Sequence, residues 1–407
     1  MHFFKNVSLS AFSAGFVAVL VGFTSSVAIV FQAALAFHAS PEVLASWMWS
    51  LGLGMGLCTL VPSLWLRKPV MVAWSTPGAA VLATAGLAGG FSMAEAVGAF
   101  MVCAALITLC GVTGWFERVM NHLPVAIASG LLAGVLTRFG LQAFAAAQTA
   151  LPLVVLMLLT YLVGKRLLPR YTVPLTLLSA IVFIASTSGF TRADIAFGLA
   201  SPVFVAPVFT LSAAISLALP LFVVTMASQN LPGVIAIQAA GYGRQPGEVN
   251  NQGIPISKII TLTGLATLVL APFGAFALNL SAITAAICMG REAHPDPAKR
   301  YTAAVSCGLL YVLIGLFGGT ITGVLTAFPK ELIAGIAGLA LLGTIGSALT
   351  TALRDDLHRE AALITFLVTL SGVVIAGVGS AFWGVLAGAL ALFVQQYGKS
   401  HFAPPAP

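Results

Sequence analysis

The stretch PVMVAWSTPGAAVLAT, residues 69–84, lies in an apolar part of the chain but lacks the pattern of an unbroken helix. β-Branched and aromatic residues come first, and Ser75, Thr76, Pro77 and Gly78 then give the signal of a helix start. A short extended segment that leads into a new helix is the structure that this order predicts. The question is why a chain would interrupt a helix within an apolar run.

The composition places this interruption inside a membrane. Of the 407 residues, 59% are hydrophobic and 7% are charged, whereas soluble domains carry about 25% charged residues. The net charge of +7 comes from basic residues scattered singly between apolar runs, which is typical of membrane topology and argues against a nucleic-acid partner. The five cysteines lie in apolar segments without CxxC spacing, so we expect buried thiols, no metal site and no cofactor.

Apolar runs of about 17–25 residues predict fourteen membrane spans in an all-α polytopic fold. The predicted spans are 10–37, 43–66, 70–88, 92–114, 124–144, 149–168, 172–190, 208–233, 256–271, 273–290, 300–325, 329–351, 358–377 and 380–397. With the N-terminus in the cytoplasm, the external side receives only Arg138, Arg192 and Lys330 of the 18 basic residues. This charge bias predicts an inner-membrane protein with both termini in the cytoplasm.

A second stretch, PFGAFALNLSAITAAI at residues 272–287, matches the first at an offset of 203 residues. This offset places Thr76 on Asn279 and Gly78 on Ser281, and other short matches recur at similar offsets. The chain therefore divides into repeats, residues 1–200 and 201–407. Because seven spans per repeat is an odd number, the repeats must be inverted, which is the architecture of secondary transporters.

Extended backbone inside a membrane must be buried in protein or line a cavity. Residues 70–75 and 273–278 could pair with each other as two short strands in spans 3 and 10. Half-helices beginning near Thr76 and Asn279 would then point their N-terminal ends at one shared site. Such ends carry free N–H groups and a partial positive charge, which suits an anion. The alternative is an ordinary helix kinked at Pro77.

Neutral polar residues, rather than charges, lie deep in the predicted spans, because all eleven acidic residues and all six histidines fall in loops or near span ends. The aromatic side chains near the breaks could form an apolar wall beside polar donors, as a small aromatic carboxylate would need. The predicted substrate-binding residues are Ser25, Ser26, Trp74, Ser75, Thr76, Gly78, Gln229, Asn230, Phe276, Asn279 and Ser281. For most of the hydroxyl groups, bonding to their own helix is the alternative.

The chain resembles the benzoate membrane transport proteins, the BenE family, over nearly its whole length. The segments that carry the resemblance are GFTSSVAIVFQAA, WSTPGAA, HLPVAIASGLLAGVL, ASQNLPG and NLSAITAAICMG, in that order. The resemblance implies a core domain of spans 1–4 and 8–11, about residues 8–114 and 208–325. It also implies a gate domain of spans 5–7 and 12–14, about residues 115–200 and 326–398, with a homodimer possible.

The resemblance further implies benzoate uptake with protons. The related nucleobase transporters place glutamates about where Gln229 and Leu278-Asn279 stand in this chain. Neutral residues at both places remove repulsion against a carboxylate and favour an anionic substrate. They also leave the proton route open, with Glu95, Glu331 or the substrate acid itself as candidates.

These observations predict a secondary active transporter for a small aromatic carboxylate, benzoate first, with H⁺ symport and an elevator-type motion. The alternatives are transport of another organic anion or a nucleobase, and a passive anion channel on the same fold. A membrane-embedded enzyme would need a deep constellation of His, Asp, Glu or Cys side chains, which the sequence lacks.

Overall fold

The computed structural model describes residues 8–24, 26–88, 90–115, 125–187, 198–243, 253–291, 293–373, 375 and 380–396. These residues form an all-α polytopic membrane protein with helix in every one of the fourteen predicted spans. Within them, eight helices are long and apolar enough to cross a membrane, or nine spans if one bent pair of helices counts as a single span. The only strands in this part of the chain form one antiparallel pair.

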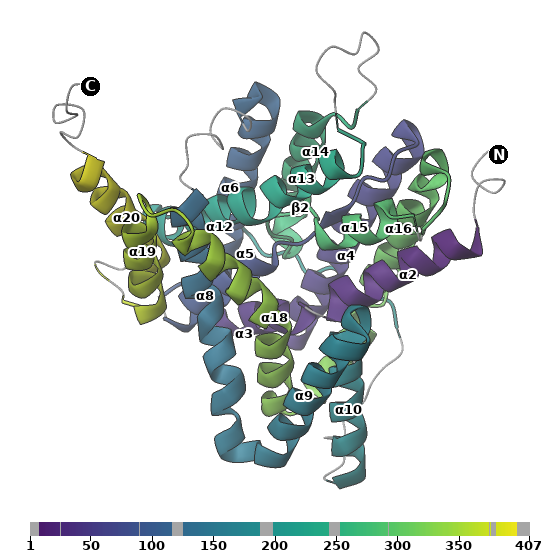
Figure 1. The fold of residues 1–407 in the computed structure, drawn as a ribbon, viewed down its shortest axis with the longest axis horizontal. Coiled ribbons are helices and arrows are strands. Elements are labelled where there is room, and N and C mark those ends of the chain that lie inside the picture. Colours follow the sequence, from purple (N-terminus) through teal and green to yellow (C-terminus); the bar gives the residue numbers. More distant parts are fainter. Residues whose placement is uncertain are drawn as a thin grey trace, which may run out of the picture.

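The first half of the chain, purple and blue in Figure 1, supplies the helices up to residue 187. Its elements are α2 (Leu9–Thr24), α3 (Val27–Ala36), α4 (Pro41–Leu66), β1 (Val72–Ala73), α5 (Thr76–Leu87), α6 (Met93–Thr113), α8 (Val125–Ala145), α9 (Ala147–Leu167), η1 (Pro169–Tyr171) and α10 (Thr172–Thr187). Ser40 caps α4, and Ser92 with Glu95 forms a capping box at the start of α6.

The second half runs from teal to yellow in Figure 1. It contains α11 (Leu211–Ala213), η2 (Ala214–Ala218), α12 (Leu219–Thr225), η3 (Met226–Asn230), α13 (Leu231–Ala239), α14 (Ile256–Leu270), η4 (Ala271–Phe273), β2 (Asn279–Leu280), α15 (Ile283–Met289), η5 (Pro297–Lys299), α16 (Tyr301–Leu316), α17 (Gly318–Thr326), α18 (Lys330–Leu353), α19 (Arg359–Ser371) and α20 (Ser380–Gln396).

The helices pack as two inverted repeats. Helix α4 packs along α16, and α14 packs along α6, which is the same pair with the two halves exchanged. In the same way α9 packs on α10 and α19 packs on α20, while α8 packs on its own equivalent, α18. Partners are exchanged in this way when a pseudo-twofold axis relates the two halves. The packing therefore agrees with the seven-plus-seven arrangement of inverted repeats predicted from the sequence.

The two strands lie at the predicted breaks but in a shifted register. Val72 pairs with Leu280, and Ala73 pairs with Asn279. Helix α15 begins 207 residues after α5, at residue 283 against residue 76. The offset of 203 residues expected from the sequence is thus four residues too short at the breaks.

Two further expectations about the second break are wrong. The extended residues are not 273–278, because Ala271–Phe273 forms a 3₁₀ turn and the chain then reverses at Gly274, whose φ is +102°. The half-helix does not begin at Asn279, since its backbone belongs to the strand pair with Ala73. A helix can begin only after that ladder ends, and the N-cap of α15 is Ala282.

Two other predicted spans are interrupted. Span 1 consists of two helices, because α2 ends at Thr24 and α3 begins at Val27. Span 11 was predicted as one helix over 300–325, but α16 and α17 meet at an angle of 72°. The two glycines at 318 and 319 follow the bend directly, and Gly-rich pairs are frequent causes of sharp kinks.

An extended linker, residues 198–210, joins the two halves by crossing the ends of several helices. Its backbone N–H groups donate to Leu316 O at 2.7 Å, Pro272 O at 2.8 Å and Ala94 O at 2.9 Å. The Ser46 hydroxyl of α4 accepts from Val203 N at 2.9 Å and donates to Phe273 O at 2.9 Å. Ser46 therefore ties α4 to both the linker and the turn before β2.

Replacing Ser46 with alanine is expected to lower the free energy of unfolding by about 1–2 kcal/mol, because a partly buried N–H and a partly buried carbonyl each lose a partner. Ser50, one turn further along α4, is the matched control. Its hydroxyl bonds only to Trp47 O of its own helix, so Ser50→Ala should cost less than about 0.5 kcal/mol. Melting temperatures of the two variants in detergent would contradict this role for Ser46 if they were equal.

Candidate functional site

The first extended segment has its backbone groups satisfied inside the protein. On the side of β1 away from β2, Thr59 Oγ1 of α4 accepts from Val72 N at 3.0 Å. One turn along the same helix, Ser63 Oγ accepts from Val70 N at 3.0 Å and donates to Val70 O at 3.1 Å. Two hydroxyls of α4 thus take the place of a third strand. This explains how an extended backbone persists at membrane depth.

The second segment is held in an equivalent way. Leu278 N donates to Thr267 Oγ1 of α14 at 3.1 Å, and Leu280 N donates to Asn230 Oδ1 at 2.9 Å. Helix α14 occupies the place in the second repeat that α4 occupies in the first. Asn230, fully buried, therefore has a structural task in holding β2.

The start of α5 is built by Ser75 and Gly78. Ser75 Oγ accepts from Gly78 N at 3.0 Å and from Thr225 Oγ1 at 2.9 Å, so this hydroxyl is committed to capping the helix. A Cβ on Gly78 would lie 2.5 Å from Leu221 Cδ1 of α12, which explains the glycine. Neither residue lines the cavity described next, but both fix the position of Thr76, which does.

A cavity of about 600 Å³ lies against both half-helices and is bounded on its other side by α8, α9, α10 and α18. Its volume falls within the range of about 300–1,000 Å³ that small-molecule sites occupy. The polar and aromatic residues in its lining are Phe23, Ser26, Trp74, Thr76, Tyr161, Lys165, Thr172, Ser228, Gln229, Ser281, Thr284, Tyr311 and Ser347.

The closed end of the cavity has an aromatic wall. The rings of Phe23 and Trp74 lie with centroids 5.6 Å apart and planes tilted by 50°. The Trp74 indole Nε1 donates to Ser26 Oγ at 2.8 Å, and that hydroxyl donates in turn to Gly22 O at 2.9 Å. This chain of bonds fixes the indole plane. Ser26 therefore orients the aromatic wall, and its hydroxyl group is engaged in two hydrogen bonds within the protein, one accepted from Trp74 and one donated to Gly22 O.

Two adjacent amides point to different places because the helix is irregular there. Residues Met226–Asn230 form a π-helical turn, which is frequent at functional sites. Within this turn Ser228 and Gln229 line the cavity, whereas Asn230 faces β2. Of the two amides, only Gln229 therefore reaches the cavity.

On the side of the second half-helix, the cavity is lined by Ser281, Thr284 and Tyr311. Thr284 Oγ1 donates to Ser281 Oγ at 2.7 Å, and Ser281 N donates to Met71 O at 3.0 Å, so this end is tied to the first repeat. The cavity as a whole combines a flat apolar wall with hydroxyl and amide donors. Such a lining accommodates an aromatic ring that carries a polar group.

Comparison with known proteins agrees with this geometry. The family model described as benzoate membrane transport protein (BenE) matches residues 5–394. The chain belongs to this family. It is 47% identical to the inner membrane protein YdcO of Escherichia coli, with 94% of each chain covered, and 40% identical to a benzoate membrane transport protein of Acinetobacter baylyi, with 95% of each covered. This BenE-family chain is therefore a membrane transport protein.

A solved structure shares the fold. The transmembrane domain of a cyanobacterium bicarbonate transporter, BicA, aligns with a TM-score of 0.59 over 95% of this chain and 98% of that one. The sequence identity is 13%, so the likeness concerns the fold alone. It agrees with an all-α polytopic architecture for the BenE-family protein.

The predicted site residues of this BenE-family chain divide into two groups. Ser26, Trp74, Thr76, Gln229 and Ser281 line the cavity. The predicted residues that do not line it are Ser75, Gly78, Asn230, Phe276 and Asn279, and Ser25 lies outside the described residues.

Phe276 and Asn279, two of the predicted residues that do not line the cavity, are buried inside the protein. Phe276 packs between the rings of Trp47 and Phe100, at centroid distances of 5.6 and 5.8 Å, in a fully buried aromatic cluster. Asn279 is also fully buried; its Nδ2 donates to Ala277 O at 2.9 Å, and its Oδ1 has no partner. Both side chains therefore lie inside the protein and away from the cavity lining.

The two candidate proton carriers lie at helix starts away from the cavity. Glu95 accepts from Ser92 N and Ser92 Oγ, each at 2.9 Å, in the capping box of α6. Glu331 accepts from Thr149 Oγ1 at 3.3 Å at the start of α18. Neither lines the cavity, and no group of three His, Cys, Asp or Glu in the described part of the chain could hold a metal ion.

Sequence reasoning missed the contribution of α9, where Tyr161 and Lys165 both line the cavity. Their spacing of four residues puts them on one helix face, which is the signal that could have revealed them. It also missed Tyr311, whose neighbours in sequence are apolar, and Thr284, which follows the predicted Ser281 by three residues. A single tyrosine in an apolar span predicts an interfacial position as readily as a site.

Proposed function

We propose that this BenE-family chain is a secondary active transporter that imports a small aromatic carboxylate, with benzoate as the first candidate. The observation that carries the proposal is the cavity lining, in which the Trp74 and Phe23 rings stand beside the Gln229 amide and the Thr76 hydroxyl. A benzoate ring can pack on the aromatic wall while its carboxylate accepts from the donors. The name of the Acinetobacter baylyi relative supports the same substrate.

We assign the moving parts to the domains predicted from the sequence. The core is residues 8–114 and 208–325, and the gate is residues 115–200 and 326–398. Trp74 and Gln229 reach the cavity from the core, and Tyr161 reaches it from the gate. Movement of the core against the gate would carry the site across the membrane in an elevator-type motion. The strand pair and its supports would travel as one body, because every bond that holds them lies within the core.

The proposed orientation puts both termini in the cytoplasm of a cell with the chain in its inner membrane, as the charge bias predicts. Protons would drive import. Glu95, Glu331 and the substrate acid itself are the candidate carriers, and the position of both glutamates away from the cavity favours the third. A homodimer through the gate is compatible with the apolar, exposed faces of α9 and α10.

Proteoliposomes with the purified protein are expected to take up labelled benzoate faster and to a higher level when the outside is more acidic. Protein-free liposomes under the same gradient are the essential control, because benzoic acid itself crosses lipid. Saturation of the protein-dependent rate, and competition by benzoate over benzamide, uracil and bicarbonate, would identify the substrate class. Rates equal to those of protein-free liposomes would contradict the proposal, and saturable uptake without response to the pH gradient would favour a passive channel.

A further inference from the structure

One charged side chain reaches the cavity. Among the described residues that line it, Lys165 of α9 is the only one with a formal charge. Lys165 is exposed, whereas Trp74 and Ser281 in the same lining are buried. The ammonium group therefore stands where the cavity opens to water, and the aromatic wall and the half-helix starts stand at the closed end.

An aromatic ring of the cavity lining lies beside this ammonium group. Lys165 Nζ lies 5.6 Å from the centroid of the Tyr161 ring, a cation–π distance, and Tyr161 is itself a buried residue of the lining. No carboxylate in the described part of the chain lies within ion-pair distance of Lys165.

A basic residue at this position also has an ordinary explanation. Lys165 and Arg166 both lie in the last turn of α9, where cations favour the helix dipole and set membrane topology. Arg166, however, does not line the cavity. Lys165 and Arg166 share the helix end and the charge, but only Lys165 lines the cavity. A comparison of variants at the two positions therefore distinguishes the role of a cation at a helix end from a role in the site.

We propose that Lys165 is a specificity residue for the carboxylate: its ammonium group attracts the anion to the open end of the cavity and selects it over neutral analogues. This inference rests on the proposed function and adds the residue that reads the substrate's charge. The deeper lining offers neutral hydrogen-bond donors, which the carbonyl group of a neutral analogue can also use, so these donors distinguish the charge of the substrate less directly than an ammonium group does. A fixed cation at the mouth raises the local concentration of anions, as charged clefts do. Tyr161 acts as a positioning residue that keeps the ammonium over the opening.

The test is equilibrium binding of benzoate and of benzamide to the purified full-length protein in detergent. Lys165→Gln is expected to raise the Kd for benzoate by up to about fivefold, the limit set by about 1 kcal/mol for two charges in contact in water, since the carboxylate is proposed to lie deeper than the mouth. The Kd for benzamide should stay unchanged, because that analogue has no net charge. Lys165→Arg should retain tight binding, and Arg166→Gln, the matched control, should bind benzoate as the wild type does.

Salt gives a second readout that a merely structural role would not move. Raising the ionic strength from 0.1 to 1 M shortens the Debye length from about 10 to about 3 Å. The Kd of the wild type for benzoate should therefore rise with salt, and that of Lys165→Gln should rise less. Equal melting temperatures of the two glutamine variants would verify that both are folded.

Three results would overturn the inference. Unchanged benzoate affinity in Lys165→Gln would show that the ammonium does not act on the ligand. Equal weakening by Arg166→Gln would assign the effect to the helix end, and equal weakening for benzamide would assign it to a loss of shape. Uptake by the wild type in proteoliposomes tests the proposed function separately. If the wild type takes up benzoate but Lys165→Gln binds it unchanged, only this inference is contradicted. If the wild type shows no uptake, both the inference and the proposed function are contradicted.

Discussion

Replacing Gln229 with alanine is expected to weaken benzoate binding by about 10- to 100-fold, the loss of one hydrogen bond to a charged group. Gln229 lines the cavity from the π-helical turn and faces the side where the carboxylate is proposed to lie. The melting temperature of the ligand-free protein should stay within the error of the wild type, because the residue is only half-buried and has no hydrogen-bond partner among the described residues. Isothermal titration with benzoate measures the first quantity, and a thermal melt measures the second.

The neighbouring amide is the control for this prediction. Asn230 is fully buried and accepts from Leu280 N of β2. Asn230→Ala should therefore lower the free energy of unfolding by about 1–3 kcal/mol, since a buried N–H loses its acceptor. The two adjacent amides would then affect different quantities: Gln229 the affinity for benzoate, and Asn230 the free energy of unfolding. If Gln229→Ala leaves the benzoate affinity unchanged, the carboxylate does not bind at the π-helical turn, and the candidate site loses its principal donor.

The main features of the fold could be predicted from the sequence because they depend on composition and periodicity. Apolar runs locate the helices of all fourteen spans, and the odd number of spans per repeat forces the inversion. The position of the second break could not be predicted to the residue. In an apolar, low-complexity chain, a match such as Pro69 with Pro272 at an offset of 203 residues arises readily by chance, and only the strand pair, Val72–Ala73 with Asn279–Leu280, gives the offset of 207.

The supports of the breaks were beyond sequence reasoning for another reason. Thr59, Ser63 and Thr267 are hydroxyl residues within long apolar helices, where bonding to the residue's own helix is the usual expectation. Their role appears only when the strands are placed beside α4 and α14. The spacing of four residues between Thr59 and Ser63 puts them on one face of α4, but this pattern recurs by chance in many helices.

The candidate site could be predicted in part. Residues next to the breaks, such as Trp74 and Thr76, could be predicted because the sequence pattern of the break locates them. Asn230 and Gln229 were equivalent in the sequence, because an amide at depth needs partners wherever it points. The π-helical turn that separates their directions depends on tertiary packing and has no sequence signal that we can name. Residues of the opposite wall, such as Tyr161 of α9, lie far from the breaks in the sequence, so the pattern around the breaks does not indicate them.

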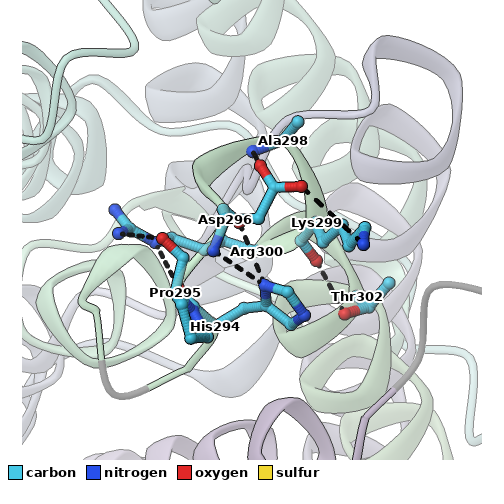
Figure 2. Close-up of polar contacts among 7 residues, drawn as sticks. All are labelled: His294, Pro295, Asp296, Ala298, Lys299, Arg300 and Thr302. Atoms are coloured by element: carbon cyan, nitrogen blue, oxygen red, sulfur yellow. Dashed lines mark hydrogen bonds and ion pairs between the residues drawn. The ribbon is translucent and has the colours of Figure 1, made fainter.

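Arg300→Met is expected to produce the largest loss of stability, about 3 kcal/mol, because it leaves buried carbonyl groups without a donor. Arg300 is 7% exposed and lies after the end of α15. Its Nη1 donates to Met289 O, the last residue of that helix, at 2.8 Å, and its Nε donates to His294 O at 2.8 Å. Figure 2 shows the guanidinium reaching back along the 294–300 loop, with a longer contact to Pro295 O at 3.5 Å.

Lys299, the preceding residue, provides the matched control. Its side chain is 42% exposed and lies 3.8 Å from Asp296 Oδ2, a surface ion pair worth about 0–1 kcal/mol. Lys299→Met should therefore melt close to the wild type. Arg300→Lys should recover part of the loss, since an ammonium keeps the charge but lacks the planar fork that reaches two carbonyls at once.

The consequence for function follows from the position of α15. This half-helix has seven residues, and its first turn carries Ile283 and Thr284 into the cavity lining. A helix so short does not hold its place by its own hydrogen bonds, so the guanidinium at its far end fixes where the cavity wall lies. Arg300→Met should thus raise the Kd for benzoate as well as lower the melting temperature. In the double variant with Asn230→Ala, the loss of unfolding free energy should be less than the sum of the two single losses if both changes loosen the same strand and half-helix. Full additivity of the two variants, or equal melting of Arg300→Met and Lys299→Met, would mean that α15 is held by its packing against α2 and α16 rather than by the carbonyl cluster.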